Sequence, residues 1–408
     1  MSAIKFNPSS FRKNFKWFEN NKNWINFDNA ATSIALDVVA EASKEYYQYF
    51  CVNPHNKNPE INQKLIAIIE ETRDLLAKFF NAKKNEIIFT SSATESLNLF
   101  AFGLSSLVKS NDEIILKEDE HAANVFPWVN LAKENKAKLK IIKKTPNKSW
   151  TDAFLKACTP STKLLVITAT SNLFGNSIDY EKISKHLKKI SPNSFIVVDA
   201  VQAVPHHKID ITSANIDFLT FSTHKFYGPT GLGIAFIKSE LQSRLKPFKL
   251  GGDIFKSLDN NFKIIFKEGP SKFEAGTLNI MAIYALNKQL KFMQKEFNFS
   301  EMVFYSKQLK NLAYQLLSQN PNIVLANHDQ DVPIFAFKHK YINSADLATF
   351  LNIKKIIVRQ GSICVGKFKN KESFLRVSLL HYNTKEELLY LEKLLKTSKN
   401  SIINELIY

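Results

Sequence analysis

The chain has 408 residues, 45% of them hydrophobic, which is enough for two domains or for one large domain with a smaller partner. This composition excludes a disordered or collagen-like protein, and no apolar run approaches the roughly 20 residues that a membrane span needs. The formal net charge of +17 would suit a nucleic-acid-binding protein. The lysines are spread along the whole chain without a long basic block, which favours a solvated surface over direct nucleic acid binding. A basic rim that meets an acidic protein or a transfer RNA stays open.

The N-terminus and the cysteines together predict a cytoplasmic protein. The first residues, M-S-A-I-K-F-N-P-S-S-F, contain no continuous apolar core of signal-peptide length. Cys51, Cys158 and Cys364 lie far apart and form no metal-ligand pair of the C-x-x-C type, so we expect no metal site. Free thiols are typical of a reducing compartment.

The first part of the chain predicts a short strand and two helices. Residues 1–25 are polar with scattered aromatic side chains and are expected to lie across another part of the fold. Phe27–Ser33 (F-D-N-A-A-T-S) predicts a strand followed by small residues, where a ligand could approach the backbone. Asp37–Phe50 and Ile61–Phe80 have apolar residues at helical spacing, with a breaker loop, N-P-H-N-K-N-P, between them.

From residue 87 onward, strands and helices alternate. The continuous Val, Ile and Leu runs indicate strands that are buried on both faces, hence a mainly parallel sheet flanked by helices. Ligands of such sheets bind beyond the carboxyl ends of the strands. The expected strands are Ile87–Thr90, Glu113–Leu116, Lys138–Ile142, Leu164–Thr168, Phe195–Val198 and Phe218–Phe221, and the expected helices are Thr94–Val108, Ala122–Asn135 and Tyr180–Ile190.

After about residue 280 the pattern predicts a smaller α+β domain. Two long helices, Ala282–Phe297 and Met302–Gln319, precede short strands, and a last helix covers Lys385–Lys396. The fold class is therefore α/β, with a large domain over residues 26–281 and a small domain made of residues 1–25 and 282–408. The short strands are Ile323–Leu325, Val332–Phe337, Ile356–Val358 and Phe374–Ser378.

One lysine, Lys225, lies in a polar, glycine-rich turn between two apolar runs, Phe218–Phe221 and Ile234–Ile237. A lysine is a nucleophile only as the free amine, so it needs surroundings that disfavour its charged form. A lysine that carries pyridoxal phosphate (PLP) has this need, together with hydroxyl and imidazole donors for the phosphate, such as Ser222 and His224. The alternative is a lysine in an ordinary hairpin.

Asp199 ends the buried run F-I-V-V-D, where a carboxylate is costly without a partner. The protonated ring nitrogen of PLP would be such a partner, and Gln202 follows one turn later, where it could donate to the phenolic oxygen of the cofactor. The alternative is an aspartate that caps the following helix. The pair therefore predicts a cofactor site without proving it.

Two further motifs lie where a strand gives way to a helix. In T-S-S-A-T-E, Ser92 and Glu95 fit a capping box, and the same geometry would aim backbone N–H groups at a phosphate held near Thr94 and Glu95. In E-H-A-A-N, His121 could lie over a flat ring and move protons, although a histidine at such a junction is often structural.

A cysteine and an arginine stand out near the C-terminus. Cys364 lies in a loop between Gly361 and Gly366, and its thiol would matter only if accessible and deprotonated. Arg376 lies within an apolar strand, where it would either clamp a substrate carboxylate or form a structural salt bridge. Cys51 and Cys158 lack comparable context and are expected to be inert.

These motifs, taken together, resemble group II (Suf-type) cysteine desulfurases, which are fold-type-I, class-V PLP enzymes. The resemblance covers nearly the whole chain in order. It rests on S-T-H-K-F-Y-G-P-T-G-L-G, V-D-A-V-Q-A-V-P-H-H, E-H-A-A-N-V-F-P-W, F-E-A-G-T-L-N and R-x-S-L-x-x-Y-N-T.

The resemblance implies a role for each candidate residue. Lys225 carries PLP and later moves the substrate α-proton, with His121 as a further catalytic group. The Cys364 thiolate attacks the sulfur of L-cysteine and leaves alanine and an enzyme persulfide. The implied cofactor residues are Thr94, Glu95, His121, Asp199, Gln202, Ser222, His224 and Lys225, with Thr277 reaching the phosphate of a neighbouring subunit. The implied substrate residues are Ala30, Asn172, Arg359 and Arg376.

The resemblance also implies partners and leaves alternatives. It implies a homodimer, a small sulfur-acceptor protein, and a supply of sulfur to iron–sulfur clusters or transfer-RNA thiolation. Gly251–Phe273 is long enough for the extra hairpin of group II. Ser362 and Ile363 replace the usual histidines before the reactive cysteine, and N-P-H replaces H-R-G near residue 53. Another class-V PLP enzyme (a selenocysteine lyase or an aminotransferase) and a binding protein without turnover remain as alternatives.

Overall fold

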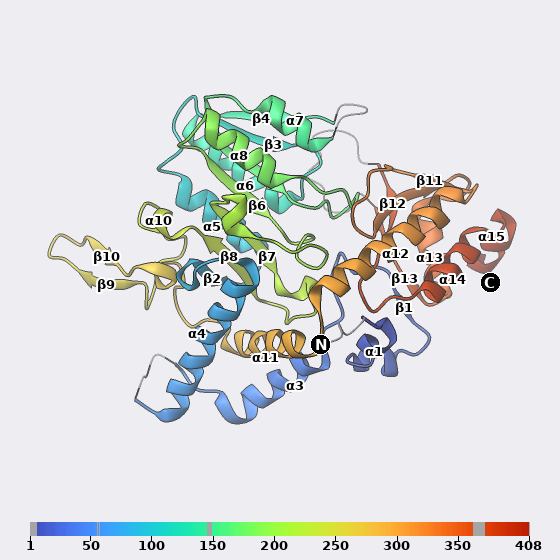
Figure 1. Ribbon diagram of the computed structural model, residues 1–408, viewed down its shortest axis with the longest axis horizontal. Coiled ribbons are helices and arrows are strands. Elements are labelled where there is room, and N and C mark those ends of the chain that lie inside the picture. The colour runs from blue at the N-terminus through green and yellow to red at the C-terminus, as the bar shows by residue number, and fades with distance from the viewer. Residues whose placement is uncertain (1–5, 55, 57, 145–148, 362–371, 408) are drawn as a thin grey trace.

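The computed structural model describes residues 6–407 except 55, 57, 145–148 and 362–371. Figure 1 shows a larger part built on one sheet and, beside it, a smaller part that carries the C-terminus. The predicted α/β class is confirmed. Among the described residues, no helix is long and apolar enough to cross a membrane.

The larger part is organised around a sheet of seven described strands. Only β8, among these strands, runs antiparallel to its two neighbours, so the sheet is mainly parallel, as predicted. Every residue of β2, β6, β7 and β8 is buried, which explains the continuous apolar runs. In spatial order the strands are β2 (Ile87–Thr90), β8 (Gly233–Ile237), β7 (Phe218–Ser222), β6 (Phe195–Asp199), β5 (Thr162–Thr168), β3 (Glu113–Lys117) and β4 (Lys138–Ile142).

Helices cover both faces of this sheet, because successive strand residues point to opposite sides. Ile87 and Phe89 join one buried cluster and Ile88 joins the other. The first cluster is covered by α3 (Asp37–Glu45) with its π-helical continuation Tyr46–Phe50, α4 (Glu60–Phe80), α7 (Trp150–Ala157), α8 (Tyr180–Ile190), α9 (Ile211–Ala214) and α11 (Ile280–Glu296). The second is covered by α5 (Ala93–Leu104), α6 (Phe126–Asn135) and α10 (Ser239–Gln242).

The smaller part contains a separate antiparallel sheet and its own apolar cluster. Within the described chain the strand order is β11 (Ile323–Leu325), β12 (Ile334–His339), β15 (Phe374–Ser378) and β14 (Arg359–Gly361). Its helices are α12 (Phe299–Gln319), α13 (Ser344–Ile353), α14 (Lys385–Leu395) and α15 (Lys399–Ile407). The exact domain boundaries stay a prediction.

The beginning of the chain differs from the prediction in detail. Residues 1–25 were expected only to lie across the fold, and the described part forms the short helices α1 (Pro8–Arg12) and α2 (Lys16–Asn20). The strand expected at Phe27–Ser33 lies earlier, as β1 (Ile25–Asn26), which pairs in parallel with β13 (Ile356–Ile357). Backbone pairing continues through Phe27 and an isolated parallel bridge between Asp28 and Ser378, and from Asn29 onward hydrogen bonds that involve side chains take over the contact with β15.

The hairpin expected within Gly251–Phe273 is present as β9 (Phe255–Leu258) and β10 (Ile264–Phe266). It projects from the larger part, in yellow in Figure 1. Its apolar side chains face solvent, and that of Phe262 at its tip is 83% exposed. Exposed apolar surface of this kind marks an interaction site.

Candidate functional site

One cavity of about 330 Å³ gathers most of the predicted site residues. It lies beyond the carboxyl ends of β5, β6 and β7, where Thr168, Asp199 and Ser222 are the last strand residues. The predicted residues that line it are Ala30, Thr94, His121, Asn172, Asp199, Gln202, Ser222, His224, Lys225, Arg359 and Arg376. The lining residues that the sequence had not singled out include Ala31, Ala93, Thr168 and Val201.

Two of the predicted residues that the structure describes, Glu95 and Thr277, are not part of this lining. Glu95 is on the first turn of α5, and its carboxylate pairs with Lys249 at 2.6 Å. Thr277 is exposed, and its role in a neighbouring subunit stays a prediction. Cys364 lies outside the described residues.

Lys225 ends a 3₁₀ turn, Thr223–Lys225, between β7 and β8. Its Nζ donates to the carbonyl oxygens of Ala30 (2.9 Å) and Ala31. The turn is tight because Gly228 follows it, and a Cβ there would come within 2.6 Å of Gln289 Oε1. A glycine at this position therefore lets the chain after the lysine pack closely against Thr223 and Gln289.

Asp199 is 5% exposed at the end of β6. Its Oδ1 accepts a hydrogen bond from the backbone N–H of Val201 at 3.0 Å, and burial raises its pKa to about 6. Gln202 Nε2 donates to the Ala30 carbonyl oxygen at 2.8 Å. A buried carboxylate whose ionisation is disfavoured is suited to a cationic partner such as a protonated ring nitrogen.

The N-terminus of α5 lines the cavity, and a helix N-terminus is suited to hold an anion. Ser92 caps the helix, and Ser222 Oγ accepts a hydrogen bond from the N–H of Ala93 at 2.9 Å. Gly233 permits this close approach, because a Cβ there would lie 2.4 Å from the Ser92 carbonyl carbon. The predicted capping box is only half right, since the Glu95 carboxylate accepts from the N–H of Ser91 (2.9 Å) rather than from Ser92.

The two histidines of the site are disposed to be neutral at neutral pH. Burial, reinforced by the Lys225 charge, lowers the pKa of His224 to about 4, and its Nδ1 lies 3.1 Å from Thr32 Oγ1. Burial also lowers the pKa of His121, whose Nδ1 accepts from the N–H of Ala123 at 3.1 Å. The remaining ring nitrogen of His121 therefore carries the proton in the neutral form.

Glu120, which the sequence analysis passed over, anchors the His121 turn. Its fully buried carboxylate accepts hydrogen bonds from the N–H of Thr168 and from Asn124 Nδ2, both at 3.0 Å. Lys117 Nζ lies 3.7 Å away. The acidic run Glu118–Glu120, which follows the mostly buried strand β3, was the signal that could have identified this residue.

Arg376, for which the sequence left two interpretations, has two hydrogen-bond partners. Arg376 is 2% exposed, and its guanidinium donates to the Asn172 carbonyl oxygen (2.8 Å) and to Asp28 Oδ1 (2.6 Å). Arg359 Nη1 lies 4.0 Å from the other Asp28 oxygen. Arg376 therefore forms a salt bridge and also lines the cavity, and its role toward a substrate carboxylate stays a prediction. Asp28 was missed, although it is the one charged residue of F-D-N-A-A-T-S.

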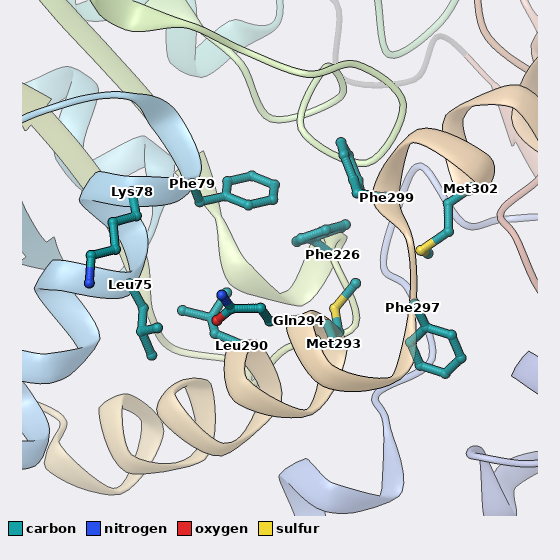
Figure 2. A pocket seen from close by; sticks show the side chains of 10 residues that line it. All are labelled: Leu75, Lys78, Phe79, Phe226, Leu290, Met293, Gln294, Phe297, Phe299 and Met302. Atoms are coloured by element: carbon teal, nitrogen blue, oxygen red, sulfur yellow. The ribbon is translucent and has the colours of Figure 1, made fainter. Parts of the chain in front are cut away.

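A second cavity, of about 280 Å³, lies behind the Lys225 turn, with Phe226 in its wall (Figure 2). Apolar and aromatic side chains form most of it, and the polar ones among its described lining residues are Lys78 and Gln294. None of those described lining residues carries a carboxylate or an imidazole. The first cavity is therefore the one suited to a charged cofactor.

The donor set of the first cavity fits PLP. It combines an amine (Lys225), a buried carboxylate for a ring nitrogen (Asp199) and an imidazole for a ring face (His121). An amide (Gln202) and a helix N-terminus with a serine hydroxyl (Ser222) supply donors for the phenolic and phosphate oxygens.

The raised pKa of Asp199 predicts that the cofactor-free protein becomes less stable to unfolding as the pH rises. In the unfolded chain this group ionises near 3.8, whereas in the folded protein it does so near 6. The folded protein therefore binds this proton more tightly, and the free energy of unfolding falls as pH rises through that interval, by roughly 3 kcal/mol. We expect Asp199→Asn to be more stable than wild type at pH 7 by up to that amount, and equally stable near pH 4.

Urea unfolding of the cofactor-free proteins at the two pH values measures this difference. Asp210→Asn is the control, because hydrogen bonds at the start of α9 lower the pKa of Asp210, so its replacement should not stabilise the protein at pH 7. Equal stability of Asp199→Asn and wild type at pH 7 would contradict the prediction.

Comparison with known proteins gives matches over almost the full length. Residues 25–391 match the class-V aminotransferase family. A probable cysteine desulfurase of Mycoplasma pneumoniae is 62% identical over 407 residues and 100% of both chains. One from Ureaplasma parvum is 36% identical over 92% of this chain and 94% of its own. Among solved structures, the apo cysteine desulfurase of Thermococcus onnurineus is 27% identical, with a TM-score of 0.88 over 97% of this chain and 98% of that one. The cysteine desulfurase CsdA of Escherichia coli is also 27% identical, with a TM-score of 0.87 over 98% and 99%.

Proposed function

Because this chain belongs to the class-V aminotransferase family and, within it, to the cysteine desulfurases, we propose that it converts L-cysteine to L-alanine with PLP as cofactor and leaves the sulfur on Cys364 as a persulfide. One observation supports this most strongly. Lys225, Asp199 and Arg376 reach a single cavity from three separate segments of the chain.

PLP, when bound, withdraws electrons from the α-carbon of an amino acid. Lys225 would hold it through Nζ and move the substrate α-proton, and the Asp199 carboxylate would pair with its protonated ring nitrogen. His121 would lie on the ring and Gln202 would donate to the phenolic oxygen. The phosphate would be held by Thr94, Ser222 and His224, with Glu95 supporting the helix start.

The substrate carboxylate would be held at the opposite end of the cavity from the α5 N-terminus. Arg376 and Arg359 supply the positive charge, and Asn172 and Ala30 border them. An arginine with several donors in one plane is suited to a carboxylate. Such contacts would orient the substrate within the cavity that Lys225 also lines.

The sulfur step needs a thiolate and no external oxidant. The Cys364 sulfur forms an S–S bond to the substrate sulfur as the substrate Cβ–S bond breaks, and Cβ receives a proton to give the methyl group of alanine. The two sulfur atoms are oxidised and Cβ is reduced, so the step balances. Cys158 is unsuited to it, because burial raises the pKa of its thiol to about 11.

Release of alanine and sulfide from L-cysteine under reductant tests the proposal. We expect wild type to form both products and Cys364→Ser to form almost none, because serine cannot carry a persulfide. Cys51→Ser and Cys158→Ser are matched controls that should keep wild-type rates. Equal alanine release by Cys364→Ser would indicate another class-V enzyme, an aminotransferase or a lyase that needs no cysteine.

A homodimer is part of the proposal. Gly276 has φ of +76° and turns the following residue, Thr277, outward to solvent, where it could reach the phosphate of a second subunit. The exposed apolar hairpin nearby provides surface that a second copy would cover. A small acceptor protein in the cytoplasm would then receive the sulfur for iron–sulfur clusters or transfer-RNA thiolation.

A further inference from the structure

The two arginines of the cavity are placed against each other by the fold. In the antiparallel pair β14–β15, Arg359 and Arg376 are directly opposite. Like charges at such positions destabilise a strand pair. The Asp28 carboxylate lies between them, with one oxygen 2.6 Å from Arg376 Nη2 and the other 4.0 Å from Arg359 Nη1. One carboxylate thus serves two guanidinium groups.

The residues that follow Asp28 in the chain hold its backbone in place. Asn29 Nδ2 donates to the Ser378 carbonyl oxygen (2.7 Å), and the N–H of Ala30 donates to Ser378 Oγ (2.9 Å). Ser378 is two residues beyond Arg376 on β15, so both point to the same face of that strand. The backbone on either side of Asp28 is therefore aligned with the strand that carries Arg376.

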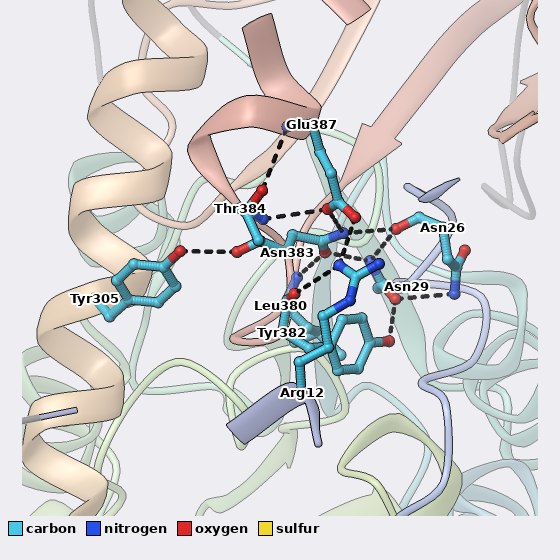
Figure 3. A network of polar contacts seen from close by, with 9 residues as sticks. All are labelled: Arg12, Asn26, Asn29, Tyr305, Leu380, Tyr382, Asn383, Thr384 and Glu387. Carbon is cyan, nitrogen blue, oxygen red and sulfur yellow. Dashed lines mark hydrogen bonds and ion pairs between the residues drawn. The ribbon is translucent and has the colours of Figure 1, made fainter. Parts of the chain in front are cut away.

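A buried polar network holds this segment from behind (Figure 3). Asn383 is fully buried; its Oδ1 accepts from Asn29 Nδ2 (3.0 Å), and its Nδ2 donates to the Asn26 carbonyl oxygen (3.0 Å) and to Glu387 Oε2 (2.9 Å). Arg12 pairs with Glu387 at 2.5 Å. Satisfied buried networks of this kind fix a single arrangement.

The two arginines depend on Asp28 to different degrees. Arg376 is buried and has a second acceptor in the Asn172 carbonyl oxygen. The side chain of Arg359 is 49% exposed. Without the carboxylate between them, repulsion from Arg376 would drive the more exposed Arg359 into solvent and away from the substrate.

We propose that Asp28 is a positioning residue that keeps Arg359 and Arg376 together over the cavity for the carboxylate of the substrate. This rests on the proposed function of the cavity and names how its carboxylate end is assembled. Among the described residues of this cluster, two guanidinium groups share one carboxylate, so the cluster remains suited to attract the α-carboxylate of a substrate. Asp28 takes no part in the chemistry at the α-carbon, so removing its carboxylate should weaken binding of the substrate carboxylate more than it lowers turnover.

The test compares two ligands of the PLP-loaded enzyme, L-alanine and L-alaninamide, which differ only in the carboxylate. Binding is followed by the change in the visible absorbance of the cofactor. We expect Asp28→Ala to weaken L-alanine binding at least about tenfold (about 1.4 kcal/mol) and to leave L-alaninamide binding unchanged. With L-cysteine, KM should rise by a similar factor while kcat changes less than about threefold. Asp28→Asn keeps an acceptor for Arg376 and should give a smaller rise.

A double-mutant cycle with Arg359→Ala isolates the positioning effect. In the Arg359→Ala background, Asp28→Ala should weaken L-alanine binding by less than about threefold, because the residue it holds is gone. Unchanged or tighter L-alanine binding by Asp28→Ala and Asp28→Asn would overturn the inference. If wild type fails to prefer L-alanine over L-alaninamide, the carboxylate site itself is wrong. A failure of wild type to release alanine from L-cysteine would instead contradict the proposed activity.

Discussion

Lys225→Ala should lose essentially all turnover of L-cysteine and the visible absorbance of bound PLP. No other lysine lines the cavity among the described residues, so none can take over its covalent attachment or its proton transfer. A positioned acid–base group contributes about 10²- to 10⁴-fold, and loss of the covalent attachment adds to this. Absorbance after dialysis and alanine release measure the two effects separately.

Lys185→Ala is the matched control for this variant. Lys185 lies on the exposed side of α8, where it pairs with Glu181 one turn away at 2.5 Å. Its removal should change neither absorbance nor rate. If Lys225→Ala kept both, Lys225 would not be the residue that carries the cofactor.

The largest effect on stability is expected from Glu274→Ala. Glu274 and Arg73 form a buried ion pair, with each side chain 6% exposed and contacts of 2.8 and 2.5 Å. Glu274 Oε1 also accepts from the N–H of Phe89 at 2.7 Å, and Arg73 donates to the Ile87 carbonyl oxygen at 2.7 Å. Without Glu274, the buried Arg73 guanidinium keeps the half-exposed Glu70, at 3.2 Å, and the Ile87 carbonyl oxygen as partners. It loses its buried carboxylate, and the Phe89 N–H of edge strand β2 loses its acceptor, which together costs about 3–5 kcal/mol.

Urea unfolding of the cofactor-free protein measures this cost as a lower midpoint. Glu181→Ala, which breaks an exposed pair, should change the free energy of unfolding by less than about 0.5 kcal/mol. Replacing both Arg73 and Glu274 with apolar residues should recover part of the loss, since no charge is then left buried. A Glu274→Ala effect as small as that of Glu181→Ala would contradict the buried-pair account.

Local pattern predicted much of the fold and part of the site. The strands Ile87–Thr90, Lys138–Ile142 and Phe374–Ser378 have the expected bounds. A continuous buried run defines the first, and apolar residues predominate in the other two although lysine or arginine interrupts them. Lys225 and Asp199 could be predicted for a related reason, since a charged residue at or just beyond the end of an apolar strand has few structural explanations.

The elements and partners that the sequence left out depend on contacts between distant residues. Helices α7, α13 and α15 are short, and α13 was missed although Asn343 caps it. The Glu95–Lys249 pair and the Asp28–Arg376 pair join segments that no periodicity connects. Tyr227, with φ of +62° beside the catalytic turn, is held by a hydrogen bond to the distant His381. Such pairings follow only from the three-dimensional arrangement.

The hydrogen bonds of Asn29 to β15 and to Asn383 can form only late in the synthesis of this protein. The segment around it is made among the first residues, whereas its partners Ser378 and Asn383 lie 349 and 354 residues later. Domains fold as they emerge from the ribosome, N-terminal parts first. The early segment must therefore wait for nearly the whole polypeptide before it can dock. A prematurely terminated product that lacks β15 would carry the lysine of the site without its substrate-carboxylate end.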